Sequence, residues 1–122
     1  MRAFGELEAV IMERLWSAGE WRTVREVLTE LLQQRQIAYT TVMTVLDNLH
    51  KKGWLRRESS GKAHRYTPVM TREEYGAAQM RHALDASGDP AVALLKFVNQ
   101  MSPEEAAGLR AALDAHERRN GR

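Results

Sequence analysis

Residues 37–53, Ile-Ala-Tyr-Thr-Thr-Val-Met-Thr-Val-Leu-Asp-Asn-Leu-His-Lys-Lys-Gly, constrain the fold more than any other stretch of this chain. Apolar side chains recur there at the spacing of one helical face, namely Val42, Val45, Leu46 and Leu49. The opposite face gathers mostly short polar groups, Thr40, Thr44, Asp47, Asn48 and Lys51, with Thr41 and Met43 at its edges. Because Thr, Asn and Asp are mediocre helix formers, their concentration there indicates a function, such as reading base edges in a DNA major groove.

The charge of the chain is concentrated around this helix. The 122 residues carry a net charge of +2, but residues 35–66 alone hold seven basic and two acidic groups, a net +5. The segments before and after them carry −2 and −1. A basic patch of this kind is typical of nucleic-acid binding, although a merely solvated surface can give the same pattern.

Length and composition limit the class of protein. The length fits one domain, or one domain with a small appendage, and 43% hydrophobic residues suffice for a small core. The lack of cysteine excludes disulfides, thiolate metal sites and cysteine nucleophiles. No apolar run approaches the roughly 18 residues of a membrane span, and residues 1–8 lack the apolar stretch of a signal peptide. We therefore expect a cytoplasmic protein without direct membrane insertion.

Two helices are expected before the central one. An apolar stripe predicts the first from about Glu6 to Ala18. Thr23 and Glu26 form a capping box at the start of the second, which we expect to reach about Gln34. Only a short polar turn then separates it from the helix of short polar groups. This order predicts a helix-turn-helix, whose second helix enters the major groove.

A basic hairpin follows the central helix. Residues 54–58 and 63–67 have the pattern of two short strands around a loop of residues 59–62, and residues 20–22 could form another strand. A hairpin in this position is the wing of a winged helix. The basic groups expected at the DNA backbone are Lys51, Lys52, Arg56, Arg57, Lys62, His64 and Arg65. Each of them alone could equally be a solvated charge. The prediction of a DNA contact therefore depends on their occurring together, on a hairpin beside the helix of short polar groups.

The chain is therefore expected to be mostly α, with a winged helix DNA-binding domain at residues 1–68 and a three-helix dimerisation region at residues 71–122. The first of these three helices has a weak apolar stripe that includes Tyr75, which is typical of a spacer. The second is apolar around most of its circumference, and a single chain cannot bury all of this apolar surface. These helices could fold back on the N-terminal domain or exchange with a second copy, and the second is favoured because the winged helix already has its own core. We expect a homodimer held by Leu94, Leu95, Phe97, Val98, Leu109 and Leu113.

No constellation of residues favours catalysis or a cofactor. The four histidines, His50, His64, His82 and His116, fall on different expected elements and lack metal-ligand spacing. There is no Gly-rich phosphate loop and no serine nucleophile motif. Besides a winged-helix protein that reads DNA with this helix, two alternatives remain: a winged-helix module that binds an acidic protein, and a DNA-binding regulator that responds to a small molecule.

Residues 38–55, followed by His-Arg-Tyr-Thr-Pro at 64–68, resemble the penicillinase-repressor (BlaI/MecI) family, and the resemblance extends to residues 94–98 and 109–110. It implies a homodimeric winged-helix repressor that binds inverted repeats of the TACA/TGTA type upstream of β-lactam-response genes. It also implies that a membrane sensor-protease system relieves repression through a cut in the dimerisation helices. The positions that match the family's DNA contacts are Thr40, Thr41, Met43, Thr44 and Asn48.

The chain departs from the family at several of these positions. Several relatives carry Lys or Arg at positions 40, 43 and 48, where this chain has Thr, Met and Asn, so part of the operator preference is expected to differ. The family's scissile Asn-Phe bond corresponds to Lys96-Phe97. The copper-responsive relatives carry C-terminal cysteines; this chain has none, so it cannot bind a ligand through such cysteines.

Overall fold

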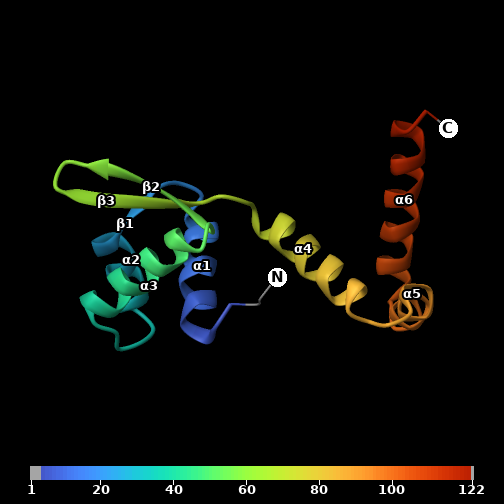
Figure 1. The fold of residues 1–122 in the computed structure, drawn as a ribbon, viewed down its shortest axis with the longest axis horizontal. Helices are drawn as coiled ribbons and strands as arrows, with labels where there is room; N and C mark the ends of the chain where they lie inside the picture. Colours follow the sequence, from blue (N-terminus) through green and yellow to red (C-terminus); the bar gives the residue numbers. More distant parts are fainter. Residues whose placement is uncertain (1–3, 122) are drawn as a thin grey trace. The chain divides into compact units, whose positions relative to one another are not determined.

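The computed structural model describes residues 4–121 of the chain. Within them the chain forms six helices and three strands (Figure 1). In chain order they are α1 (Glu6–Ala18), β1 (Arg22–Thr23), α2 (Val24–Leu31), α3 (Tyr39–Lys51), β2 (Leu55–Ser60), β3 (Ala63–Pro68), α4 (Arg72–Asp85), α5 (Pro90–Val98) and α6 (Pro103–Arg119). They divide into two compact units, the first ending at Gln79 and the second beginning at Met80. The functional division expected at residues 68 and 71 stays a prediction.

The core of the first unit fixes which side of α3 faces solvent. Val42, Leu46 and Leu49 on α3 are fully buried, as the apolar stripe predicts. They pack with buried side chains from α1, α2 and the two wing strands: Ile11, Met12, Leu15, Val24, Val27, Leu31, Leu55 and Tyr66. Since removing apolar area from water stabilises the folded state by about 25 cal/mol per Å², any rotation of α3 about its axis would be costly. Its polar face therefore stays outside.

Local signals set the ends of α1. The Glu8 carboxylate accepts a hydrogen bond of 3.0 Å from the backbone N–H of Gly5, which satisfies one of the free donors at the helix start. Gly19 follows the last turn in the left-handed region, at φ 71°, where a side chain would be strained. The helix runs from Glu6 to Ala18, and the predicted bounds are confirmed.

The start of α2 is as predicted, whereas its end is not. The Thr23 hydroxyl accepts from the Glu26 N–H at 3.1 Å, and the Glu26 carboxylate accepts from the Thr23 N–H at 2.9 Å. The second of these bonds lowers the pKa of Glu26 below its ordinary value. The helix ends at Leu31, however, so the expected end near Gln34 was wrong. The chain continues through Leu32 in right-handed geometry, without a glycine to mark the stop.

The three strands form one antiparallel sheet in the order β1-β3-β2. Strand β1 pairs Arg22 with Tyr66, so the short strand expected at residues 20–22 lies slightly later in the chain. In the wing, β2 pairs with β3 along its whole length, from Leu55 opposite Pro68 to Ser60 opposite Ala63. The wing loop is therefore a two-residue turn at residues 61–62, not the expected four-residue loop. Gly61, at φ 66°, supplies the left-handed geometry that such a turn requires.

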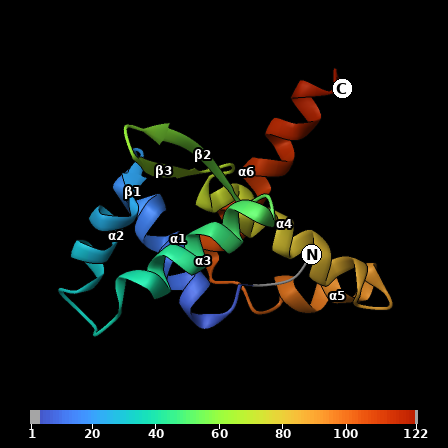
Figure 2. The same cartoon turned by 60° about the vertical axis from the view of Figure 1, so that its left-hand side comes forward.

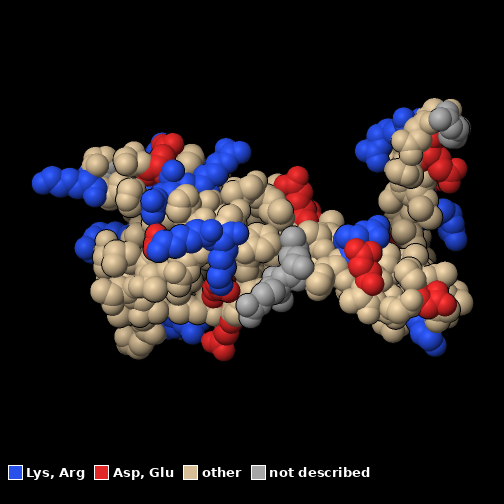
Figure 3. Space-filling view, in the orientation of Figure 1, with Lys and Arg blue, Asp and Glu red and all other residues tan. Residues whose placement is uncertain are grey.

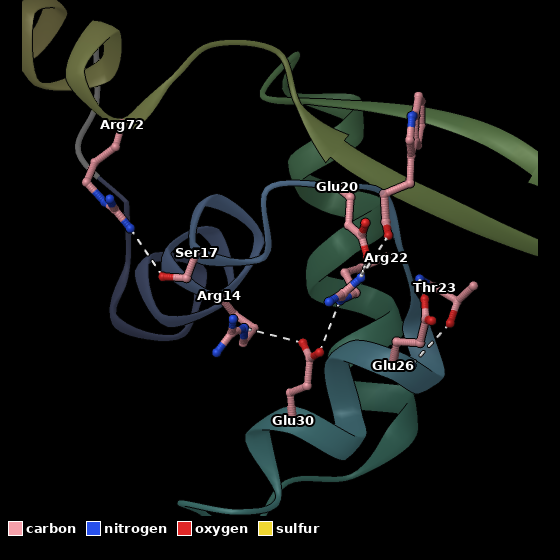
Figure 4. A network of polar contacts seen from close by, with 9 residues as sticks. Arg14, Ser17, Glu20, Arg22, Thr23, Glu26, Glu30 and Arg72 are labelled. Atoms are coloured by element: carbon pink, nitrogen blue, oxygen red, sulfur yellow. Dashed lines mark hydrogen bonds and ion pairs between the residues drawn. The ribbon is translucent and has the colours of Figure 1, made fainter.

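A half-buried polar network joins α1, β1 and α2 (Figure 4). The Glu30 carboxylate lies 3.3 Å from Arg14 Nε and 3.1 Å from Arg22 Nε. A hydrogen bond to Glu20 and the nearby charge of Glu30 raise the pKa of Arg22 above its already high value. Because one carboxylate serves two guanidinium groups, the network holds α2 against α1 beside the core.

The second unit has capped helices but exposed apolar side chains. The Asp89 carboxylate accepts from the Val92 N–H at 3.3 Å at the start of α5, and the Ser102 hydroxyl accepts from the Glu105 N–H at 3.1 Å at the start of α6. Yet α5 and α6 contain no buried residue. Among the described residues, no helix is long and apolar enough to cross a membrane.

Candidate nucleic-acid interface

The outward face of α3 presents the residues that were predicted to read bases. Thr40, Thr41, Met43, Thr44 and Asn48 are all exposed, on a helix whose other face is buried. Figure 2 turns α3 to the front, with the wing behind and above it. The only acidic group on this helix is Asp47, which lies partly exposed beside Asn48. These five exposed side chains therefore form a row of hydroxyl, amide and thioether groups, none of which is charged.

The wing presents a second set of groups beside this helix. Arg56, Lys62 and His64 are exposed, and Lys62 lies in the tight turn at the wing tip. No carboxylate in the described part of the chain forms an ion pair with Arg56 or Lys62. Lys and Arg side chains lie along the wing and α3 on the face drawn in Figure 3. These cations are available to an anionic partner.

Asp47 holds two of the other candidate cations. Its carboxylate lies 3.0 Å from Lys51 Nζ, one helical turn away, and 3.1 Å from Arg57 Nη1 on β2. A hydrogen bond from Lys51, with the charges of Lys51 and Arg57, lowers the pKa of Asp47 below its ordinary value. The carboxylate therefore ties the wing to α3 and cancels part of the positive charge at their junction.

The remaining predicted cations are paired as well. Lys52 Nζ lies 2.7 Å from the Glu8 carboxylate, which belongs to α1. Arg65 pairs with Glu58 across the wing and lies over the Trp21 ring, with its guanidinium carbon 5.1 Å from the ring centroid. Sequence patterning placed these groups on the basic surface but could not distinguish the paired ones from the unpaired ones.

Arg25 is a candidate contact that the sequence analysis missed. It is exposed on α2, and its guanidinium carbon lies 5.5 Å from the centroid of the Tyr39 ring at the start of α3. Tyr39 is itself 41% exposed. Arg25 thus extends the basic surface to the end of α3 opposite Lys51. Nothing in the spacing of the sequence relates it to Tyr39; only the fold brings the two together.

The histidines do not form a centre of their own. His50 Nδ1 lies 3.1 Å from the backbone carbonyl oxygen of Leu55, so this ring joins the end of α3 to the first wing strand. His64 lies exposed on β3. Across residues 4–121, no three His, Cys, Asp or Glu side chains come close enough together to hold a metal ion.

Comparison with known proteins decides the family. A family model described as penicillinase repressor matches residues 4–115. The chain belongs to the penicillinase repressor family. Two curated relatives, both named transcriptional regulator BlaI and from two strains of Mycobacterium tuberculosis, are each 43% identical over 120 residues. The match covers 96% of this chain and 87% of each relative. The resemblance read from residues 38–68 is thus confirmed.

A solved structure of a DNA-binding domain supports the fold. The solution structure of the DNA-binding domain of the repressor BlaI matches with a TM-score of 0.53 and 27% identity. The match covers 62% of this chain and 94% of that domain. The predicted winged helix-turn-helix in a mostly helical chain is therefore confirmed.

Proposed function

We propose that this transcriptional repressor of the BlaI type binds operator DNA with α3 in the major groove and the wing against the phosphate backbone. The observation that carries the proposal is the exposed row of short polar groups on α3, flanked by the exposed cations Arg56 and Lys62, which pair with no carboxylate among the described residues. The similar solved domain, from the repressor BlaI, is a DNA-binding domain. Phosphate contacts would position the protein, while the α3 side chains would read the sequence.

Thr44 and Asn48 are proposed to supply sequence specificity. A threonine methyl can pack on a thymine methyl, and an asparagine amide can form two hydrogen bonds with adenine. We expect Thr44→Ala and Asn48→Ala each to narrow the affinity gap between operator and random DNA, by about 1–3 kcal/mol where a bidentate contact is lost. Fluorescence titrations of each variant with both duplexes measure this gap.

Lys62→Ala is the matched control, because Lys62 is exposed on the wing and pairs with no carboxylate of the described chain. It should weaken binding to operator and random DNA nearly equally and flatten the dependence on log salt by about one unit. Lys51→Ala should have a smaller effect, since Asp47 already neutralises Lys51. If the Thr44 and Asn48 variants lose affinity for both duplexes to the same extent as Lys62→Ala, α3 does not read bases.

Asp47 should restrain non-specific binding. Asp47→Asn removes the carboxylate that pairs with Lys51 and Arg57, so both cations become available to phosphates. We expect tighter binding to random DNA and a salt dependence steeper by about one unit. Asp85→Asn is the matched control, since Asp85 forms the same type of helical ion pair, 3.2 Å from Arg81, outside the proposed interface. An unchanged salt dependence for Asp47→Asn would contradict a role for this carboxylate at the DNA surface.

We further propose that the protein acts as a homodimer on palindromic operators of the TACA/TGTA type that control β-lactam-response genes. In the single chain, the side chains predicted to form the dimer contact are largely exposed: Leu94 48%, Leu95 61%, Phe97 47%, Val98 38% and Leu113 53%. Leu109 is half-buried. A second copy would cover this surface, and we expect the two half-sites of the operator to lie about one turn of DNA apart, roughly 34 Å.

Relief of repression is proposed to follow a cut at the Lys96-Phe97 bond, made in response to a membrane sensor-protease system. Both residues lie in the last turn of α5, where local opening is easiest, and both are exposed in the single chain before a second copy covers Phe97. The cut would separate Leu94 and Leu95 from Phe97 and the whole of α6.

Mass spectrometry of the repressor from cells given a β-lactam tests the cut. We expect a fragment ending at Lys96, and we expect Lys96→Asn, which restores the family's Asn-Phe bond, to be cut faster. An intact chain during full derepression would rule out proteolysis as the switch.

A further inference from the structure

Three basic side chains of the first unit have no ion pair with a described carboxylate. Every other Lys or Arg within residues 4–79 is paired. The three exceptions, all exposed, are Arg25, Arg56 and Lys62. An ion pair cancels charge locally, so the unpaired cations supply most of the attraction for an anion. Arg56 and Lys62 belong to the wing, which leaves Arg25 on α2 as the one such cation outside it within these residues.

Arg25 is held by an aromatic ring. Its guanidinium carbon lies 5.5 Å from the centroid of the Tyr39 ring, within the range of a cation–π contact. Tyr39 is the first residue of α3 and is 41% exposed. The ring covers a face of the guanidinium, whereas the N–H groups lie in its plane, and no described residue accepts a hydrogen bond from them. The ring contact also reduces the side-chain freedom that Arg25 would lose on binding a partner.

The carboxylates near Arg25 are engaged with other groups. Glu26, its neighbour in the chain, accepts from the Thr23 N–H at 2.9 Å in the capping box. Glu30, the other acidic residue of α2, serves two arginines of the polar network (Figure 4). The first turn of α3 has no acidic residue at all. Neither carboxylate of α2 therefore occupies the donors of Arg25.

We propose that Arg25 binds a phosphate of the DNA backbone and that Tyr39 is the positioning residue that holds its guanidinium. This inference rests on the proposed function, in which α3 lies in the major groove. In a helix-turn-helix the first helix crosses the DNA backbone, while the N-terminal residues of the second contact bases. Arg25 lies in the first turn of α2 and beside the first residue of α3, so a phosphate at the edge of the groove falls within its reach. A guanidinium can bind such a phosphate through two parallel hydrogen bonds.

The test uses duplexes that carry one half-site, in which one phosphate at a time is replaced by a neutral methylphosphonate. The full chain should lose about tenfold in affinity at the phosphate that Arg25 contacts, as for a hydrogen bond to a charged group. Arg25→Ala should bind the unmodified duplex about tenfold more weakly and should lose nothing further at that one position. Its dependence on log salt should be flatter by about one unit. Lys62→Ala should keep the loss at the Arg25 phosphate, because it removes a different cation.

Variants of Tyr39 separate positioning from direct contact. Tyr39→Phe keeps the face of the ring and should reproduce the wild-type pattern of methylphosphonate losses. Tyr39→Ala removes the ring and should shrink the loss at the Arg25 phosphate while leaving the losses at other phosphates in place. Equal effects of the two variants would overturn the role of the ring as a support.

Two controls address folding and general charge. Arg25 is exposed on a helix, where alanine is the best helix former, so Arg25→Ala should unfold at no lower urea concentration than wild type. Arg118→Ala removes the same charge from an exposed position in the last turn of α6 and should leave affinity and salt dependence unchanged.

The results that overturn the phosphate contact differ from those that overturn the proposed function. An Arg25→Ala variant with the wild-type loss at every modified position shows that Arg25 contacts no phosphate. A narrower affinity gap between half-site and random DNA in Arg25→Ala places the guanidinium on a base instead. A wild type that binds half-site and random DNA equally, or neither, overturns the proposed function, and the inference with it.

Discussion

Leu95→Glu in the full chain is expected to produce a monomer and to weaken operator binding by about 10²–10⁴-fold, the usual contribution of two linked sites. Leu95 is 61% exposed in the single chain and lies on α5 among other exposed apolar side chains. A carboxylate there would have to be buried without a partner when a second copy binds, which is strongly unfavourable. Sedimentation equilibrium measures the mass, and titration of a palindromic operator measures the affinity.

Gln100→Glu is the matched control, because it adds the same carboxylate at an exposed polar position just beyond Asn99, the residue that caps the end of α5. It should leave both mass and affinity close to wild type. Binding of Leu95→Glu to a single half-site should also be unchanged, since α3 and the wing are untouched. A Leu95→Glu variant that sediments as a dimer would place the contact between copies elsewhere.

Leu46→Ala is expected to lower the free energy of unfolding of the first unit by about 2–5 kcal/mol, the range for a buried leucine that leaves a cavity. Leu46 is fully buried at the middle of α3 and packs with the buried side chains of α1 and α2. Since natural domains are stable by only about 5–15 kcal/mol, a loss of this size would leave a substantial unfolded fraction at physiological temperature. Urea denaturation followed by tryptophan fluorescence measures it.

Met43→Ala serves as the control on the same helix, because Met43 is 42% exposed on the opposite face. Its effect on unfolding should stay within about 0.5 kcal/mol, as for most surface substitutions. Comparable losses for the two variants would mean that α3 is not oriented by its apolar stripe.

The helices could be predicted well where both ends carry a local signal. The bounds of α1 follow from acidic residues in its first turn and Gly19 after its last. The starts of α2 and α6 follow from capping boxes at Thr23 and Ser102, whose hydrogen bonds join residues three apart in the sequence. These signals depend on neighbours along the chain, and a sequence displays them directly.

The end of α2 and the wing turn were harder to predict, because no local residue marks them uniquely. Leu32 continues in helical geometry after α2, so the stop depends on how the following chain packs. In the wing, Ser59 and Ser60 have the composition of a loop, yet cross-strand pairing with His64 and Ala63 extends the strand through them. Hydrogen bonds to a partner strand outweighed the weak intrinsic preference of serine.

For the candidate interface, the sequence indicated which residues face outward but not what they contact. The exposure of Thr44 and Asn48 follows from helical periodicity alone. The pairing of Lys52 with Glu8, and of Arg57 with Asp47, depends on elements that come together only in the folded chain. For the same reason the stacking of Tyr75 on Phe4 could not be predicted from the sequence. Long-range contacts of this kind carry no periodic signal.

If the exposed leucines of α5 form the contact between two copies, the number of repressor genes becomes part of the control. If each operator must be occupied by a pair of chains, the concentration of pairs rises with the square of the chain concentration while single chains predominate. Halving the number of chains would then leave about a quarter of the pairs. Transcription would respond to a falling repressor level with a threshold instead of a gradual rise, although no individual DNA contact is itself sensitive to concentration.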